Sequence, residues 1–233
     1  AVYASVYYRD SKSYLTATQN LIDQEKMAIV LQEVVGAKHE EHFFPTLSGV
    51  ARSLNFYPIG EEMPEDGIAN IALGLGKHIV DGGTTLRFSP KHPRHILQLS
   101  TTDIALRDTQ RDFYALNLNS LNDKFQTDDA FNLSRLRLKH IENIAELPYI
   151  VSTYDPYDQI IRDGNYPGGR KIISYSNILQ HDSFPLAHTI ERLLHIGKKE
   201  MGRNVEIEFA MNIANNQAHF YLLQIRPIVD NKE

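Results

Sequence analysis

The chain has 233 residues, of which 42% are hydrophobic and 23% charged, enough apolar material for a folded core. Its formal net charge of −5 excludes the generally basic surface that binds nucleic acid or anionic membranes. Because the sequence contains no cysteine, disulfides, zinc–thiolate sites and thiol nucleophiles are excluded, which fits a cytoplasmic protein. It contains neither a signal-peptide pattern nor the run of about 18 apolar residues that a membrane-spanning helix needs.

The first part of the chain predicts a mixture of helices and strands. Residues 2–21 have weakly helical apolar spacing, and the short β-branched run at residues 26–35 predicts a buried strand. Polar residues at 36–47 predict a loop, and residues 48–56 predict a second strand. Apolar residues recur every three or four positions across residues 66–80, which favours a helix despite its glycines.

The middle of the chain is poorly patterned, and the pattern becomes clear again near the C-terminus. Residues 101–121 predict a strand or an irregular segment, and residues 122–129 predict a surface connection. Glycine and proline punctuate residues 154–170, which predicts an irregular segment. At residues 184–201 an apolar stripe, with a proline near its start and a glycine after its end, predicts an amphipathic helix.

The C-terminus predicts an antiparallel β-hairpin. VEIEFAM at residues 205–211 alternates as a strand does, and NIANNQ at residues 212–217 has the composition of a turn. AHFYLLQIRPI at residues 218–228 predicts the returning strand. Together these segments predict two long strands that lie side by side.

Four polar side chains converge on one face of this hairpin. Because strand side chains alternate between faces, Glu206 and Glu208 share one face, as do Gln224 and Arg226 on the partner strand. A divalent cation such as Mg²⁺ relieves the repulsion between two carboxylates, and the amide oxygen of Gln224 is a plausible third ligand. A guanidinium binds a phosphate oxygen well. The same pattern is also typical of a solvated sheet face with cross-strand ion pairs, and both interpretations stay open at this point.

The hairpin and four earlier segments resemble a known family when they are taken together. VEIEFA and YLLQIRPI are similar to the paired D-I-E-W and I-L-Q-A-R-P strands of phosphoenolpyruvate synthase, pyruvate phosphate dikinase and the glucan water dikinases. The opening AVYASVYYRDSKSYL, then MAIVLQEVVG, SGVARSLNFYP and NIALGLGKHIVDGG resemble further family segments in the family order. Residues 101–182 carry no recognisable motif. The likeness implies the C-terminal portion of a dikinase-type ATP-grasp domain over residues 1–233.

The resemblance implies an α+β fold, namely the adenine- and metal-binding half of an ATP-grasp domain, with a mostly antiparallel sheet and flanking helices. It implies binding of ATP and Mg²⁺ and transfer of phosphate to a histidine on a separate swivelling domain. The other half of the nucleotide cleft would lie upstream in the same polypeptide. We therefore expect a piece of a longer protein that is inactive when isolated, with no nucleic-acid or membrane partner.

The resemblance also assigns roles to individual residues. Backbone groups of a strand and hinge would hold adenine, and a nearby carboxylate would accept from its exocyclic amine; these residues are Gln32, Glu33, Val34 and Val35. Ser48 and Gly49 would begin the strand beside the phosphates. Glu208 and Gln224 would hold the metal, Glu206 would assist, and Arg226 would meet the triphosphate.

Three departures from the family pattern affect these roles. Glu206 stands where the family usually has Asp, Lys77 where it usually has Glu, and Arg52 where it usually has an aromatic or aliphatic residue. The reversed charge at Lys77 motivates an alternative, a non-catalytic nucleotide-sensing or structural module derived from the family. A further alternative is an unrelated α+β interaction domain that matches by chance.

Overall fold

The computed structural model describes residues 28–119 and 132–228. The expected helix at residues 2–21 and the expected connection at residues 122–129 lie outside this range. No helix in the described part of the chain is long and apolar enough to cross a membrane.

The chain divides into two compact units. One contains Ala1–Val34 with Asp123–Phe131, and the other contains Val35–Asn122 with Asn132–Glu233. All helices and strands that the structure describes belong to the second unit.

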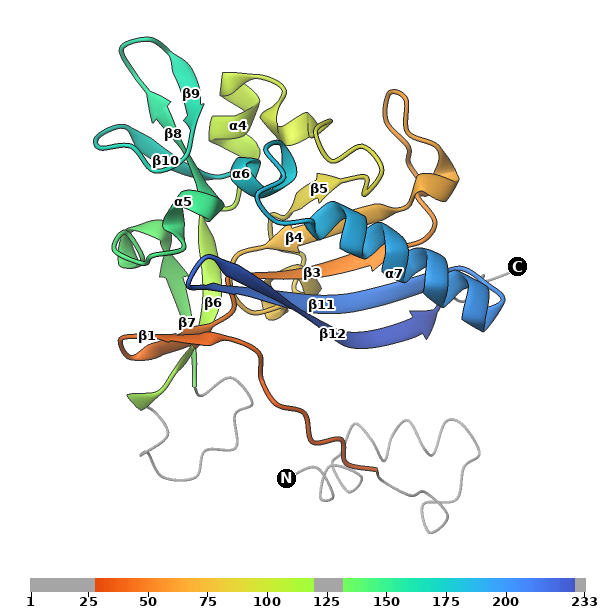
Figure 1. The fold of residues 1–233 in the computed structure, drawn as a ribbon. Helices are drawn as coiled ribbons and strands as arrows, with labels where there is room; N and C mark the ends of the chain where they lie inside the picture. Colours follow the sequence, from red (N-terminus) through yellow and green to blue (C-terminus); the bar gives the residue numbers. More distant parts are fainter. Residues whose placement is uncertain (1–27, 120–131, 229–233) are drawn as a thin grey trace, which may run out of the picture. The chain divides into compact units, whose positions relative to one another are not determined.

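A five-stranded antiparallel sheet forms the centre of the second unit (Figure 1). Its strands lie in the order β12-β11-β3-β4-β5. Their bounds are β3 (Leu47–Arg52), β4 (Ile68–Ala72), β5 (Leu86–Phe88), β11 (Val205–Ala214) and β12 (Gln217–Pro227). Strands β11 and β12 are joined through Asn215 and Asn216, whose positive φ angles of 51° and 59° suit a tight hairpin turn. The terminal hairpin is therefore confirmed, with a shorter turn than the sequence predicted.

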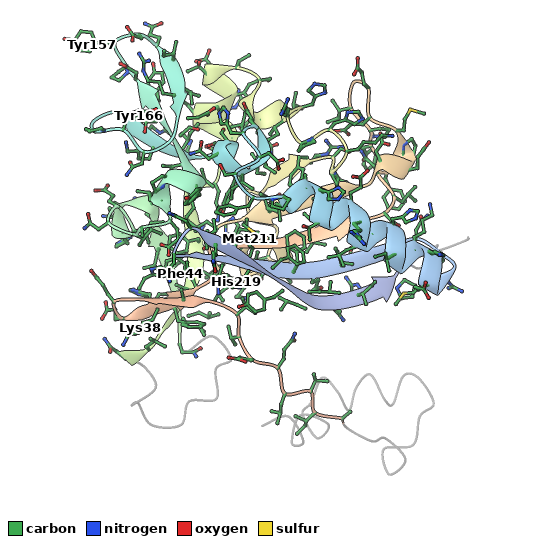
Figure 2. All side chains as sticks on the ribbon, in the orientation of Figure 1. Lys38, Phe44, Tyr157, Tyr166, Met211 and His219 are labelled. Carbon is green, nitrogen blue, oxygen red and sulfur yellow. The ribbon has the colours of Figure 1, made fainter. Side chains whose placement is uncertain are left out.

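Two smaller antiparallel sheets complete the strands. The first has the order β1-β2-β6-β7, with β1 (Ala37–His39), β2 (His42–Phe44), β6 (Asp112–Asn117) and β7 (Leu133–Arg137). The second has the order β10-β8-β9, with β8 (Val151–Asp155), β9 (Ile160–Asp163) and β10 (Arg170–Ile173). Tyr157, at the tip of the β8–β9 hairpin, projects outward (Figure 2). This residue is 97% exposed.

One long helix, α7 (Leu186–Met201), packs on the central sheet against β11, β12 and β3. Its buried stripe includes Leu186, Ile190 and Leu194, and burial of each such side chain stabilises the fold by about 1.5–3 kcal/mol. A Cβ at Gly197 would lie 2.6 Å from the Ile225 side chain, so a glycine here lets the helix approach the sheet closely. The amphipathic pattern therefore predicted this helix correctly.

The other helices are short. The α-helices are α3 (Lys77–Val80), α4 (Thr102–Asp108), α5 (Leu147–Ile150) and α6 (Ser176–Leu179). The 3-10 helices are η2 (Pro64–Asp66), η3 (Leu97–Leu99) and η5 (Leu138–His140). Helices beside antiparallel sheets confirm the α+β class.

Five expectations about local structure are wrong. The segment at residues 101–121, expected to be a strand or irregular, begins with helix α4, whose first turn is capped by the Thr101 hydroxyl, and only then forms strand β6. Residues 28–36 form neither helix nor strand, because an apolar run becomes a strand only where a neighbour offers backbone partners. The expected helix at residues 66–80 is strand β4 followed by the short α3, since β4 pairs with β3 and β5 on both sides. Polar residues 36–47 include the β1–β2 hairpin, and residues 154–170 include strand β9.

Candidate functional site

The register of three strands brings the polar side chains onto one face of the central sheet. Glu206 pairs with Arg226 on one side and with Arg52 of β3 on the other. Glu208 pairs with Gln224. We call these five residues the polar face. Their side chains point away from Val205, Ile207 and Ile225, which pack toward α7.

A β-bulge lies directly beside the polar face. The pairing of β11 with β12 shifts its register between Glu208 and Phe209, so that Phe209 pairs with Leu222. Such bulges increase the local twist and re-aim side chains. The regular alternation therefore holds for the four site residues of the hairpin and changes immediately after Glu208.

Glu206 lies between two guanidinium groups. Nε of Arg52 donates to Oε2 of Glu206 at 2.5 Å, and Nε of Arg226 donates to Oε1 at 2.8 Å. Nη2 of Arg226 also donates to Oε1. The Glu206 side chain is only 6% exposed, whereas those of Arg52 and Arg226 are 48% and 57% exposed. Both carboxylate oxygens are therefore occupied, while the guanidinium groups face solvent.

The pKa shifts follow from this arrangement. Burial on its own would raise the pKa of Glu206, but hydrogen bonds and charge from Arg52 and Arg226 outweigh it and lower the pKa. The Glu206 carboxylate raises the pKa of Arg226 through a hydrogen bond and its charge, with a smaller effect from Glu208. With two guanidinium groups and one carboxylate, the cluster of Arg52, Glu206 and Arg226 carries one net positive charge.

Glu208 and Gln224 form a second row on the polar face. Along each strand, this pair lies two positions from the pair of Glu206 and Arg226, which corresponds to roughly 7 Å between backbones. Glu208 is half-buried and Gln224 is exposed, and neither side chain has a hydrogen-bond partner within residues 28–119 and 132–228. Their oxygens are therefore available to a ligand.

The free oxygen atoms of Glu208 and Gln224 suit a magnesium ion whose other ligands are waters and substrate phosphates. Within the described ranges, no group of three or more His, Asp and Glu side chains could hold a metal. Mg²⁺, however, is usually bound through one or two carboxylates together with waters and substrate phosphates. Glu208 and Gln224 offer one carboxylate and one amide oxygen, which fits that mode of binding. Glu206 is not among these proposed metal ligands, because its carboxylate accepts hydrogen bonds from Arg52 and Arg226.

Comparison with protein-family models identifies the chain. The model described as "Pyruvate phosphate dikinase, AMP/ATP-binding domain" matches residues 1–233. The chain belongs to this family. The match includes residues 101–182, where the sequence carries no recognisable motif. No curated protein matches the chain.

Membership of the pyruvate phosphate dikinase family makes this chain an AMP/ATP-binding domain of a family of phosphotransferases. Cationic side chains bind the phosphates of a nucleotide, and the polar face carries two half-exposed guanidinium groups. A pocket of about 660 Å³ lies on the other side of the sheet, beside α7, where Leu194, Arg192 and Gly67 are among its lining residues. It contains none of the predicted site residues.

Ser48 and Gly49 of this AMP/ATP-binding domain have structural contacts. The Ser48 hydroxyl donates to the Gly74 carbonyl at 2.7 Å and so ties β3 to the glycine-rich segment after β4. A Cβ at Gly49 would lie 2.1 Å from the Phe209 ring, so only glycine leaves room for that ring. Both residues shape the strand that carries Arg52, and their role beside the phosphates stays a prediction.

The predicted adenine-binding residues lie at the boundary of the two units. Gln32, Glu33 and Val34 are exposed residues of the first unit, and Val35 begins the second. Close by in sequence, the Gly36 carbonyl accepts from the Asn212 amide at 2.9 Å, which fastens the start of the second unit to β11. Contact between these residues and adenine stays a prediction.

Arg52 is the residue that sequence reasoning missed as part of the site. In the sequence it stands out only as a departure from the family pattern. Strand alternation indicates its position, because Ser48, Val50 and Arg52 share one face of β3. Pairing of β3 with the terminal hairpin places that face, and with it Arg52, on the polar face. Sequence alone does not show that these two distant strands pair.

Proposed function

We propose that this chain is the adenine- and metal-binding half of an ATP-grasp domain, and that its polar face binds Mg·ATP in a cytoplasmic dikinase-type phosphotransferase. The observation that supports the proposal is the pairing of Glu208 with Gln224 beside two solvent-facing guanidinium groups. A hard cation and a phosphate chain need oxygen donors and guanidinium groups of this kind.

Each part of the chain would have a distinct task. Backbone groups of residues 32–35 would hold adenine, and Glu33 would accept from its exocyclic amine. Ser48 and Gly49 would begin the strand that borders the phosphates. Glu208 and Gln224 would hold magnesium, which supplies charge neutralisation on the phosphate oxygens when bound.

Arg226 would bind a phosphate oxygen while Glu206 keeps its guanidinium in place. Phosphoryl transfer depends mainly on positioning and on electrostatic stabilisation, with little covalent chemistry from the protein. The phosphoryl group would pass to a histidine on a separate swivelling domain, and upstream residues would complete the cleft. The residues of this chain would thus bind and orient the nucleotide.

Titration calorimetry on the full-length protein tests the metal role. The double variant Glu208→Ala with Gln224→Ala removes both proposed ligands, and we expect Mg²⁺-dependent ATP binding to be lost. The control Glu200→Ala with Gln217→Ala removes the same residue types from exposed positions on α7 and at the turn end of β12. An unchanged affinity in the first variant would refute the proposal.

A non-catalytic nucleotide-sensing module is the second candidate, and Lys77 favours it. The Lys77 ammonium pairs with Asp81 at 3.1 Å and lies 5.8 Å from the centre of the Tyr114 ring. Incubation of the full-length protein with γ-labelled and β-labelled ATP distinguishes the two candidates. Nucleotide binding without label on a histidine would support the sensing module.

A further inference from the structure

We propose that Arg52 is a second phosphate-binding residue, and that Arg52 and Arg226 form a two-guanidinium clamp that selects nucleotides by the length of their phosphate chain. The inference rests on the proposed function of the polar face and adds a specificity-determining residue to it. Glu206 is the positioning residue of the clamp, because it holds both guanidinium groups and does not itself reach the ligand.

The hydrogen bonds of Arg52 leave its terminal nitrogens available. Arg52 donates to Glu206 through Nε, and its two Nη groups have no hydrogen-bond partner within the described ranges. Arg226 uses Nε and Nη2, which leaves Nη1. A guanidinium presents five N–H donors in a rigid fork, so donors of both arginines remain for phosphate oxygens.

The strand order places the two arginines on opposite sides of Glu206. Arg52 lies on β3 and Arg226 on β12, with β11 between them, so their backbones are roughly 10 Å apart. Both side chains nevertheless reach the same carboxylate. An anion above Glu206 would therefore meet a guanidinium from each side.

The charges around Glu206 favour the binding of an anionic ligand. One guanidinium neutralises the Glu206 carboxylate directly, whereas the second is balanced only by the more distant Glu208 carboxylate, which has the smaller effect on Arg226. Polyphosphate compensates such a charge, and bidentate arginine–phosphate bonds are stronger than neutral hydrogen bonds. AMP has a single phosphate and would gain less from the clamp than ATP.

Binding of AMP, ADP and ATP to Arg52→Gln in the full-length protein tests the proposal. We expect ATP affinity to fall about 10- to 100-fold, which is the range for a lost hydrogen bond to a charged group, and AMP affinity to change less than about twofold. The ATP loss should persist in EDTA, because the guanidinium binds phosphate directly. Arg94→Gln removes an exposed arginine outside the polar face and should bind all three nucleotides as the wild type does.

Arg52→Lys gives a second test if Arg52→Gln does not fold. It keeps the positive charge toward Glu206, but a single ammonium replaces the fork that would bridge Glu206 and phosphate, so ATP affinity should still fall several-fold. Equal losses for AMP and ATP, or no loss, would overturn the clamp. If Glu208→Ala with Gln224→Ala removes the Mg²⁺ dependence while Arg52 variants bind normally, only the clamp fails. A wild-type protein that binds no nucleotide would overturn both proposals.

Discussion

Two buried carboxylates, Glu62 and Glu206, are both bound by arginine, but their arginines differ in what they leave available. Glu62 accepts from Nη2 of Arg87 at 2.9 Å, from the Asn55 amide at 2.8 Å and from the Ile59 backbone at 3.0 Å. Arg87 also donates to the Tyr57 carbonyl at 2.9 Å and is 22% exposed. Glu206, in contrast, is bound by two arginines that are about half exposed.

The Glu62 cluster has a structural role, whereas the Glu206 cluster has donors available for a ligand. The Glu62 cluster ties a loop to β5 and turns its donors inward, so removal of one member leaves an unpaired buried charge. The Glu206 cluster has more guanidinium than carboxylate and turns the surplus toward solvent. Variants of the first cluster should therefore change stability, and variants of the second should change nucleotide binding.

The largest expected effect is on stability at Glu62. We expect Glu62→Ala to lower the free energy of unfolding by about 3 kcal/mol, because Arg87 then loses its buried partner. Urea unfolding followed by circular dichroism measures this change. ATP affinity of the folded variant should stay within about twofold of wild type, which corresponds to less than roughly 0.5 kcal/mol. A strong loss of ATP affinity with little loss of stability would show that Glu62 is not a purely structural residue.

Glu206→Gln should change ATP affinity more than it changes stability. We expect ATP affinity to fall about tenfold, because the amide cannot accept from both guanidinium groups as the carboxylate does. The free energy of unfolding should fall by only about 1–2 kcal/mol, since both arginines can turn to solvent. Calorimetry and urea unfolding on the same preparation give both values. A larger stability loss than that of Glu62→Ala would contradict this assignment.

Acid should act on the two clusters in the same direction. In the folded state, hydrogen bonds and arginine charge outweigh the opposing effect of burial and lower the pKa of Glu62 and of Glu206. Each carboxylate therefore contributes stability that is fully present above its unfolded pKa of about 4.3 and is lost as the pH falls through the folded pKa. Unfolding free energies between pH 7 and pH 3 should fall less steeply for Glu62→Ala than for the wild type. Parallel curves would contradict a charged Glu62 in the native state.

The smallest expected effect is at Lys77. Its pair with Asp81 joins two exposed residues one helical turn apart, so its loss should cost less than about 0.5 kcal/mol of stability. Lys77→Glu restores the usual family residue and should tighten ATP binding modestly, if the position faces the nucleotide. Titration calorimetry checks this, and an unchanged ATP affinity would place Lys77 outside the binding site.

The sequence predicted those parts of the fold and site in which local pattern and pairing agree. In the terminal hairpin, period-two alternation and an asparagine turn determined both the strands and the convergence of Glu206, Glu208, Gln224 and Arg226. In α7 the apolar stripe and its terminal proline and glycine did the same. Partners far apart in sequence were not predictable: β4 is a strand because β3 and β5 flank it, and Arg52 reaches Glu206 only because β3 pairs with β11.

The most direct test is a crystal structure of the full-length protein with Mg²⁺ and a non-hydrolysable ATP analogue. We predict a metal ion about 2.0–2.1 Å from a Glu208 carboxylate oxygen and the Gln224 amide oxygen, with phosphate oxygens on the guanidinium groups of Arg52 and Arg226. A nucleotide bound beside α7, on the opposite face of the central sheet, would contradict it.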